Sequence, residues 1–295
     1  MAPAMTKKAK IVRRTIWGGS IAAVLALALW WAGTSSDGLP VALLGGVLGL
    51  AGLVELSGMG LLRTLGLRPA LYVGALITLL FAFSGVDRLL PGELGEYLAS
   101  GGLPSFVVSL FVFPAVAALL VGGGPLGRGP RAMLAGGLAL WGGLAFASIH
   151  SCWVLVGQSA FVLLLVLSKV GDIAGYYVGS AIGKSHPFPG ISPGKTTAGC
   201  VASLVVALVV AVAAAQAGWL GAERYGLVSG LVFGALINLA AQAGDLLESV
   251  VKRKAGVKDS GTWFGPSGGV LDLVDSLLLS VPMALVAWPL LFQAP

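Results

Sequence analysis

The charged residues of this chain gather in a stretch of 33 residues that reads GDLLESVVKRKAGVKDSGTWFGPSGGVLDLVDS, from Gly244 to Ser276. Only 10% of the whole chain is charged, so this density sets the stretch apart. Its ionisable residues are Asp245, Glu248, Asp259, Asp272 and Asp275, with Lys252, Arg253, Lys254 and Lys258. Ionisable groups are costly near lipid, and in an apolar chain such a cluster indicates a functional site.

The spacing of these residues suits phosphate chemistry. Asp245 and Ser249 are four residues apart and would share one face of a helix. Asp272 and Asp275 are three apart at the start of the last apolar run. Magnesium is commonly held by one or two carboxylates together with substrate phosphates, and lysine and arginine neutralise further phosphate charge. The pattern therefore predicts phosphoryl or nucleotidyl transfer, with an ion-pair network that joins helix ends as the structural alternative.

Two earlier segments are expected to join this site. In the first, Asp172 and Tyr176 lie four residues apart on one helix face, beside a stripe of glycines suited to helix packing. The second contains Ser192, Lys195 and Thr196, and Thr196 or its neighbour would cap the next helix. Hydroxyls, backbone N–H groups and a lysine at a helix start form an anion site. The alternative is a capped loop whose lysine extends toward water.

Membrane helices must position these segments. Hydrophobic residues make up 57% of the chain, and a membrane-spanning helix needs ~20 of them, which leaves room for about nine spans. We therefore predict an all-α, polytopic integral membrane helix bundle. The expected spans are 15–33, 39–57, 69–86, 104–122, 132–150, 153–171, 197–217, 226–244 and 270–292.

The positions of the basic residues predict the orientation. With the N-terminus in the cytoplasm, 16 of the 18 lysines and arginines fall on the cytoplasmic side, as the positive-inside rule requires. This orientation predicts a multi-pass protein of the inner (plasma) membrane, with its charged site on the cytoplasmic side. The net charge of +6 does not indicate nucleic-acid binding, because most of the bases lie in short loops between spans. Residues 1–150 are expected to be a lipid-embedded half and residues 151–295 a catalytic half.

Several of these residues together form a recognisable signature. The segments that carry it are Ser249-Val-Val-Lys252-Arg253, Gly256-Val-Lys258-Asp259, Gly-Gly-Val-Leu-Asp272 and Asp275-Ser276. The pattern resembles that of the phosphatidate cytidylyltransferases, also called CDP-diacylglycerol synthases. It extends to Asp172, Ser192 and Lys195 and covers about residues 165–285, whereas the first half matches only in being apolar. Two positions depart from it: Ser267 stands where the family usually has histidine, and Leu273 where it usually has arginine.

The resemblance implies a reaction and a set of site residues. CTP and phosphatidate would give CDP-diacylglycerol and pyrophosphate, a step of phospholipid biosynthesis, with Mg²⁺, room for a second monovalent or divalent cation, and a homodimer. The implied catalytic residues are Asp245, Asp259, Asp272, Asp275 and Lys258, and the metal ligands among them are Asp245, Asp259 and Asp272. The implied substrate-binding residues are Asp172, Tyr176, Ser192, Lys195, Thr196, Ser249, Lys252, Arg253, Ser267, Gly268 and Gly269.

Other functions stay open at this point. The same chemistry on another lipid phosphate, such as an isoprenoid ether lipid, would need only a different apolar groove. A CTP-dependent polyprenol kinase would release CDP instead of pyrophosphate. A relative that has lost activity would act as a scaffold, and an ion-coupled transporter would place its acids nearer the middle of the membrane.

Overall fold

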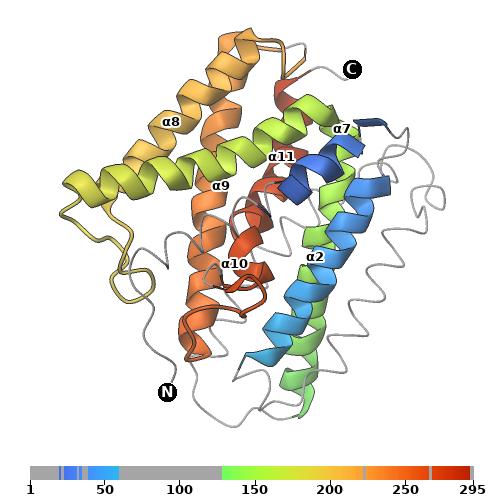
Figure 1. Ribbon diagram of the computed structural model, residues 1–295, viewed down its shortest axis with the longest axis vertical. Coiled ribbons are helices and arrows are strands. Elements are labelled where there is room, and N and C mark those ends of the chain that lie inside the picture. Colours follow the sequence, from blue (N-terminus) through green and yellow to red (C-terminus); the bar gives the residue numbers. More distant parts are fainter. Residues whose placement is uncertain are drawn as a thin grey trace.

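The computed structural model describes residues 20, 23–31, 33–34, 39–59, 128–221, 224–265 and 268–292. Its principal elements are all α-helices (Figure 1). They are α2 (Leu39–Gly58), α7 (Arg128–Ile182), α8 (Thr197–Gln216), α9 (Leu227–Lys254), α10 (Val270–Val274) and α11 (Leu277–Leu291). The prediction of a helical bundle is therefore confirmed for these parts of the chain.

Four helices in the described ranges are long and apolar enough to cross a membrane, namely Leu155–Ile182, Thr197–Gln216, Leu227–Lys254 and Val270–Leu291. The chain is accordingly an integral membrane protein. One face of α8 presents Val201, Val205 and Val209, four residues apart and each more than half exposed, as a helix side facing lipid would. The expected spans 69–86 and 104–122 lie outside the described residues, so the count of nine and the orientation stay predictions.

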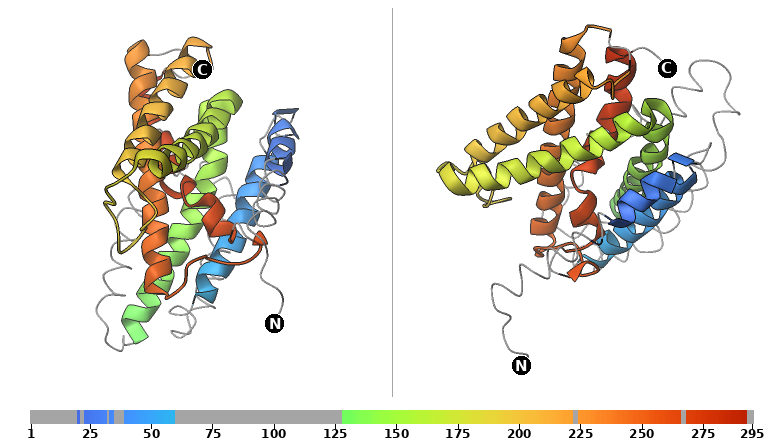
Figure 2. Two further views of the ribbon diagram at one scale, coloured as in Figure 1. Left: turned by 60° about the vertical axis from the view of Figure 1, so that its left-hand side comes forward. Right: turned by 45° about the horizontal axis from the view of Figure 1, so that its top comes forward.

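A bend in α7 changes the predicted boundaries. The two spans expected at 132–150 and 153–171 correspond to two helical segments of α7, which meet in a bend at the non-helical Gly157 (φ 78°, ψ 170°) rather than between residues 150 and 153 (Figures 1 and 2). Glycine adopts this positive φ without steric cost. The segment beyond the bend continues to Ile182 rather than ending at residue 171, and it therefore carries Asp172 within its length.

Helices α7 and α8 approach closely through glycines. A Cβ atom added at Gly199 would lie 2.6 Å from the carbonyl oxygen of Gly175. A Cβ at Gly179 would lie 2.6 Å from the Thr196 hydroxyl, and one at Gly183 would lie 2.5 Å from it. The expected packing role of the glycine stripe is thus confirmed, and it brings the helix that carries Asp172 against the start of α8.

We expect Gly199→Ala to destabilise the protein by about 1–3 kcal/mol, since the new methyl group meets a backbone carbonyl that cannot rotate away. Denaturant unfolding in detergent micelles measures this loss. The matched control is Gly194→Ala, where the added Cβ meets nothing within 4 Å. Equal stabilities of the two variants would contradict the close approach of α7 and α8.

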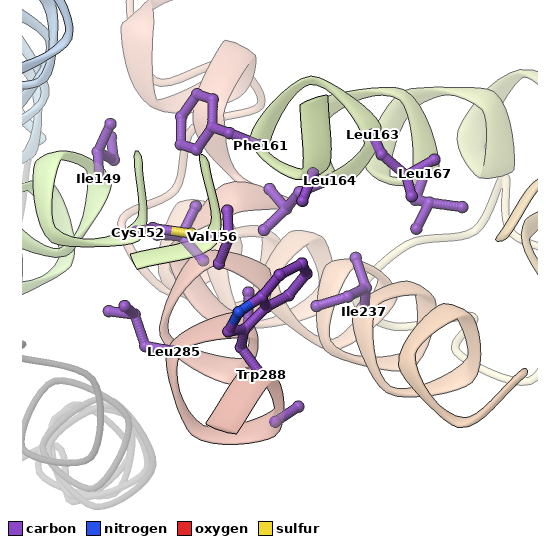
Figure 3. Packing of buried hydrophobic residues seen from close by; sticks show 14 of the residues in the cluster. Ile149, Cys152, Val156, Phe161, Leu163, Leu164, Leu167, Ile237, Leu285 and Trp288 are labelled. Carbon is purple, nitrogen blue, oxygen red and sulfur yellow. The ribbon is translucent and has the colours of Figure 1, made fainter. Parts of the chain in front are cut away.

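An apolar core joins α7, α9 and α11. Figure 3 shows Trp288 of α11 in the same buried cluster as Leu164 of α7 and Ile237 of α9. The ring of Trp288 also contacts Phe233 of α9 edge-on, with centroids 5.8 Å apart. Close van der Waals packing and edge-on ring contacts stabilise such contacts between membrane helices. The core therefore fixes α7 and α9, which carry Asp172 and Asp245, and α11, which directly follows Asp275 and Ser276.

Candidate active site

The acids of the signature divide into two groups in the structure. We name the first the three-acid cluster, consisting of Asp172, Asp245 and Asp275 with Lys169 and Lys195. We name the second the helix-start cluster, consisting of Glu55, Glu248, Lys252, Ser260 and Asp272. The first draws on α7, the loop before α8, α9 and the junction of α10 with α11, and the second lies around the first residues of α10.

In the three-acid cluster, two ion pairs join separate elements of the chain. Lys195 Nζ lies 2.7 Å from Asp245 Oδ2, and Lys169 Nζ lies 3.7 Å from Asp275 Oδ1. Asp172, Asp245 and Asp275 are close enough for their charges to repel one another. Three carboxylates against two ammonium groups give the cluster a formal charge of one negative unit.

The start of α8 positions Lys195 within this cluster. Thr196 begins α8 as its N-cap, and its hydroxyl accepts a hydrogen bond of 3.1 Å from the N–H of Gly199. That cap confirms one of the two expected threonines. The ammonium group of Lys195 also donates to the Gln242 carbonyl of α9, at 3.4 Å, and Ser249 Oγ donates to Asp245 Oδ1 at 3.5 Å. The start of α8 is thereby tied to the part of α9 that carries Asp245.

Lys169 was not among the expected site residues, yet it reaches the last span at the place where α10 meets α11. The expected single helix is confirmed as Val270–Leu291, because Asp275 and Ser276 between α10 and α11 keep helical φ and ψ angles. Lys169 Nζ donates to the Leu273 carbonyl at 3.0 Å and to Ser276 Oγ at 2.9 Å. A lysine within an apolar run, three residues before Asp172, is the signal that would have found it.

Asp272 organises the helix-start cluster. Its Oδ1 accepts a hydrogen bond from Lys252 Nζ at 2.6 Å, and its Oδ2 accepts from the N–H of Ser260 at 2.7 Å, Ser260 Oγ at 2.7 Å and the N–H of Gly269 at 2.8 Å. Lys252 also pairs with Glu248 at 2.5 Å. Both oxygens of Asp272 are therefore engaged by the protein itself.

Glu55 of α2 completes this cluster and was missed in the sequence analysis. Its Oε1 accepts a hydrogen bond of 2.9 Å from the N–H of Val270. Its Oε2 accepts bonds of 2.9 Å from the N–H of Leu271 and from Ser260 Oγ. It is the single charged residue of α2 and is buried. A lone acid in an apolar run was the available signal.

A family model described as "Cytidylyltransferase family" matches residues 12–291, nearly the whole chain. The chain belongs to the cytidylyltransferase family. That match confirms the family resemblance read from the acids, lysines and glycines of the signature.

Relatives of known name are similar to parts of this family member. A phosphatidate cytidylyltransferase of Helicobacter pylori strain J99 is 37% identical over 139 residues, 47% of this chain and 50% of that protein. One of Pseudomonas aeruginosa is 36% identical over 159 residues, 54% of this chain and 56% of that protein. The uncharacterized protein YnbB of Escherichia coli is 31% identical over 153 residues, 48% of this chain and 50% of that protein. The chain thus spans about half the length of these curated relatives.

The other signature residues of this cytidylyltransferase lie around the two clusters. Lys258 and Asp259 are exposed in the loop after α9, and Ser192 is half-buried in the loop before α8. Exposed Arg253 donates to the carbonyls of Ile191 and Val257, at 3.2 and 3.0 Å, and so links those two loops.

Of the remaining expected residues, Tyr176 and Gly268 lie within the described parts of the chain. Tyr176 is 70% exposed and contacts Tyr177 edge-on. Gly268 has a φ of 88°, and a Cβ there would meet the Asp272 carboxylate, so glycine is required on both grounds. The expected Ser267 lies outside the described residues.

The three expected metal ligands occupy different surroundings. Asp245 belongs to the three-acid cluster, Asp272 to the helix-start cluster, and Asp259 is exposed. Across the described ranges, no group of three or more His, Cys, Asp or Glu side chains is arranged to hold a metal ion. The structure does not bring Asp245, Asp259 and Asp272 into one group, and the use of Mg²⁺ stays a prediction.

Proposed function

We propose that this protein transfers a cytidylyl group from CTP to the phosphate of a membrane lipid, with phosphatidate as the first substrate to test. Pyrophosphate would be the second product. The observation that carries the proposal is the three-acid cluster, because ion-paired lysines and mutually repelling carboxylates from separate membrane helices are suited to binding phosphates and a cation together. Family membership and the names of the relatives support the same class of reaction.

The reaction requires positive charge near the phosphates and alignment of the two substrates rather than a strong base. An oxygen of the lipid phosphate forms a bond to the α-phosphorus of CTP, and the bond from that phosphorus to the oxygen leaving with pyrophosphate breaks. The attacking oxygen is already ionised near neutral pH. Lys195 and Lys169 would exchange part of their pairing with Asp245 and Asp275 for contacts with phosphate oxygens. Lys252, expected to bind phosphate, is instead buried between Glu248 and Asp272.

The three-acid cluster also has the donor chemistry for Mg²⁺. Its carboxylate oxygens are the preferred ligands of that ion, and two of them with substrate phosphates would suffice. Asp245 and Asp275 would hold the ion, with Asp172 beside them. When bound, Mg²⁺ would offset the negative charge that develops on the phosphates. Asp272 would serve the site by holding the start of α10, since its oxygens already accept from Lys252, Ser260 and Gly269.

Other lipid phosphates are to be tested alongside phosphatidate. The similarity to a protein of unassigned function, together with Ser267 and Leu273 at two signature positions, favours testing other lipid phosphates alongside phosphatidate. An isoprenoid ether lipid phosphate and a polyprenol are the alternatives that the sequence analysis leaves open.

Product analysis decides among these functions. Purified protein is given Mg²⁺, CTP labelled at either the α- or the γ-phosphate, and one lipid at a time from a panel of phosphatidate, an ether lipid phosphate and a polyprenol. We expect the α-label in the lipid and the γ-label in pyrophosphate. The γ-label in the lipid, with CDP released, would establish a kinase instead. No lipid-dependent turnover of CTP with any member of the panel would refute the proposal.

A further inference from the structure

Glu55 connects the first half of the chain with the first turn of α10. Its side chain is 6% exposed, and its two oxygens accept three hydrogen bonds of 2.9 Å. Two of the donors are the consecutive N–H groups of Val270 and Leu271, which have no partner within a helix at its first turn. A carboxylate is the favourable acceptor at that end of a helix, because the N–H groups carry positive partial charge.

The glycines around α10 leave room for this carboxylate. A Cβ added at Gly269 would overlap both oxygens of Glu55, and one added at Gly261 would overlap Oε1. The backbone of Gly269 has φ −99° and ψ −168°, an extended conformation that alanine also adopts. The need for glycine at position 269 therefore comes from the Glu55 side chain and not from the backbone.

Glu55 and Asp272 share a hydrogen-bond donor. Ser260 Oγ lies 2.9 Å from Glu55 Oε2 and 2.7 Å from Asp272 Oδ2. Asp272 in turn holds Lys252, while Leu273 and Asp275, at the far end of α10, contact Lys169. Val270 and Asp275 lie within the same six residues, so a displacement of the first turn of α10 would also move Asp275, which belongs to the three-acid cluster.

We propose that Glu55 is a positioning residue that sets the start of α10 and thereby places Asp275 in the three-acid cluster. This inference rests on the proposed function for its kinetic test, but its structural test does not. The first half of the chain then contributes directly to the geometry of the site.

The kinetic test uses Glu55→Gln, which keeps the shape of the side chain but replaces one acceptor oxygen with an NH₂ group. We expect kcat to fall about tenfold or more, as loss of hydrogen bonds to a charged group would produce. The KM for CTP should change by less than about twofold, because Lys195 and Asp245 stay in place on α8 and α9. The control is Val47→Ala, at an exposed position of the same helix, which should leave both constants unchanged.

The structural test is hydrogen–deuterium exchange of the same variants in detergent. Glu55→Gln should speed exchange in peptides that contain Val270 and Leu271, and leave peptides from the middle of α9 unchanged. Unaltered exchange at Val270 and Leu271, or a wild-type kcat despite faster exchange, would overturn the inference. If the wild-type protein turns over no lipid phosphate, the proposed function fails while the exchange experiment still decides whether Glu55 holds α10.

A double substitution guards against a simple folding defect. Gly269→Ala should slow turnover about tenfold or more, or shift the unfolding equilibrium toward the unfolded state by a similar factor. The reason is that the added methyl group overlaps the Glu55 carboxylate. In a Glu55→Ala background the same change should cost at least about threefold less, because the overlap is gone. Additive effects of the two substitutions would show that the carboxylate and Gly269 do not meet, and would overturn the inference.

Discussion

Asp245→Asn should lower the turnover of CTP about 100- to 1000-fold while leaving the protein folded. The carboxylate of Asp245 is paired with Lys195 at 2.7 Å and is repelled by Asp172 and Asp275. Removing its charge relieves repulsion within the cluster, so stability should change little, but under the proposed function a cation that bridges the cluster and the substrate phosphates would lose one of its ligands. Steady-state rates with CTP and the best lipid phosphate, together with thermal unfolding in detergent, measure the two effects.

Asp259→Asn is the informative comparison. The sequence pattern places Asp259 among the metal ligands, whereas the structure places it in an exposed part of the loop after α9. We expect a smaller loss of turnover there than at Asp245. A loss of equal size would mean that this loop closes over the site during the reaction. Wild-type turnover in Asp245→Asn would remove Asp245 and the three-acid cluster from the chemistry.

The second large effect is expected on stability. Lys252→Met should lower the free energy of unfolding by about 3 kcal/mol or more, because it leaves Glu248 and Asp272 without their shared buried cation. Lys252 is 7% exposed and Glu248 is 3% exposed, so water cannot replace the lost charge. Methionine keeps the length of the apolar part of the side chain. Denaturant unfolding in micelles gives the change.

Lys254→Met removes the same charge from an exposed position two residues later and serves as the control. It should alter stability by less than about 0.5 kcal/mol. If Lys252→Met unfolds like this control, Lys252 is free to bind phosphate, as the signature implied. If Lys252→Met is much less stable than the Lys254→Met control, the ion pairs of Lys252 with Glu248 and Asp272 stabilise the fold.

Much of the scaffold could be predicted because its causes are local. The span predicted at 197–217 corresponds to α8 at Thr197–Gln216, since hydrophobic length and a capping threonine mark both its course and its start. The bend at Gly157 could not be placed, because one glycine among 45 carries no distinguishing local signal.

Local sequence patterns do not show which acids belong to the three-acid cluster and which to the helix-start cluster. Spacing tells which residues share a helix face but not which helix lies opposite. Asp272 and Asp275 are three residues apart, yet the first contacts Lys252 and the second lies beside Lys169. The contact between residues 55 and 270 joins helices 215 positions apart, and no periodicity within either helix encodes it.

The hydrogen bonds from α10 to α2 limit how the protein can be cut or recombined. A fragment of residues 151–295 would lack the acceptor for the N–H groups of Val270 and Leu271 and would leave Ser260 with fewer partners. Chimeras that exchange the first half of the chain between relatives would need an acid at the position of Glu55 in α2. The two halves of this polypeptide are therefore not interchangeable modules, even though nearly all of the signature lies in one of them.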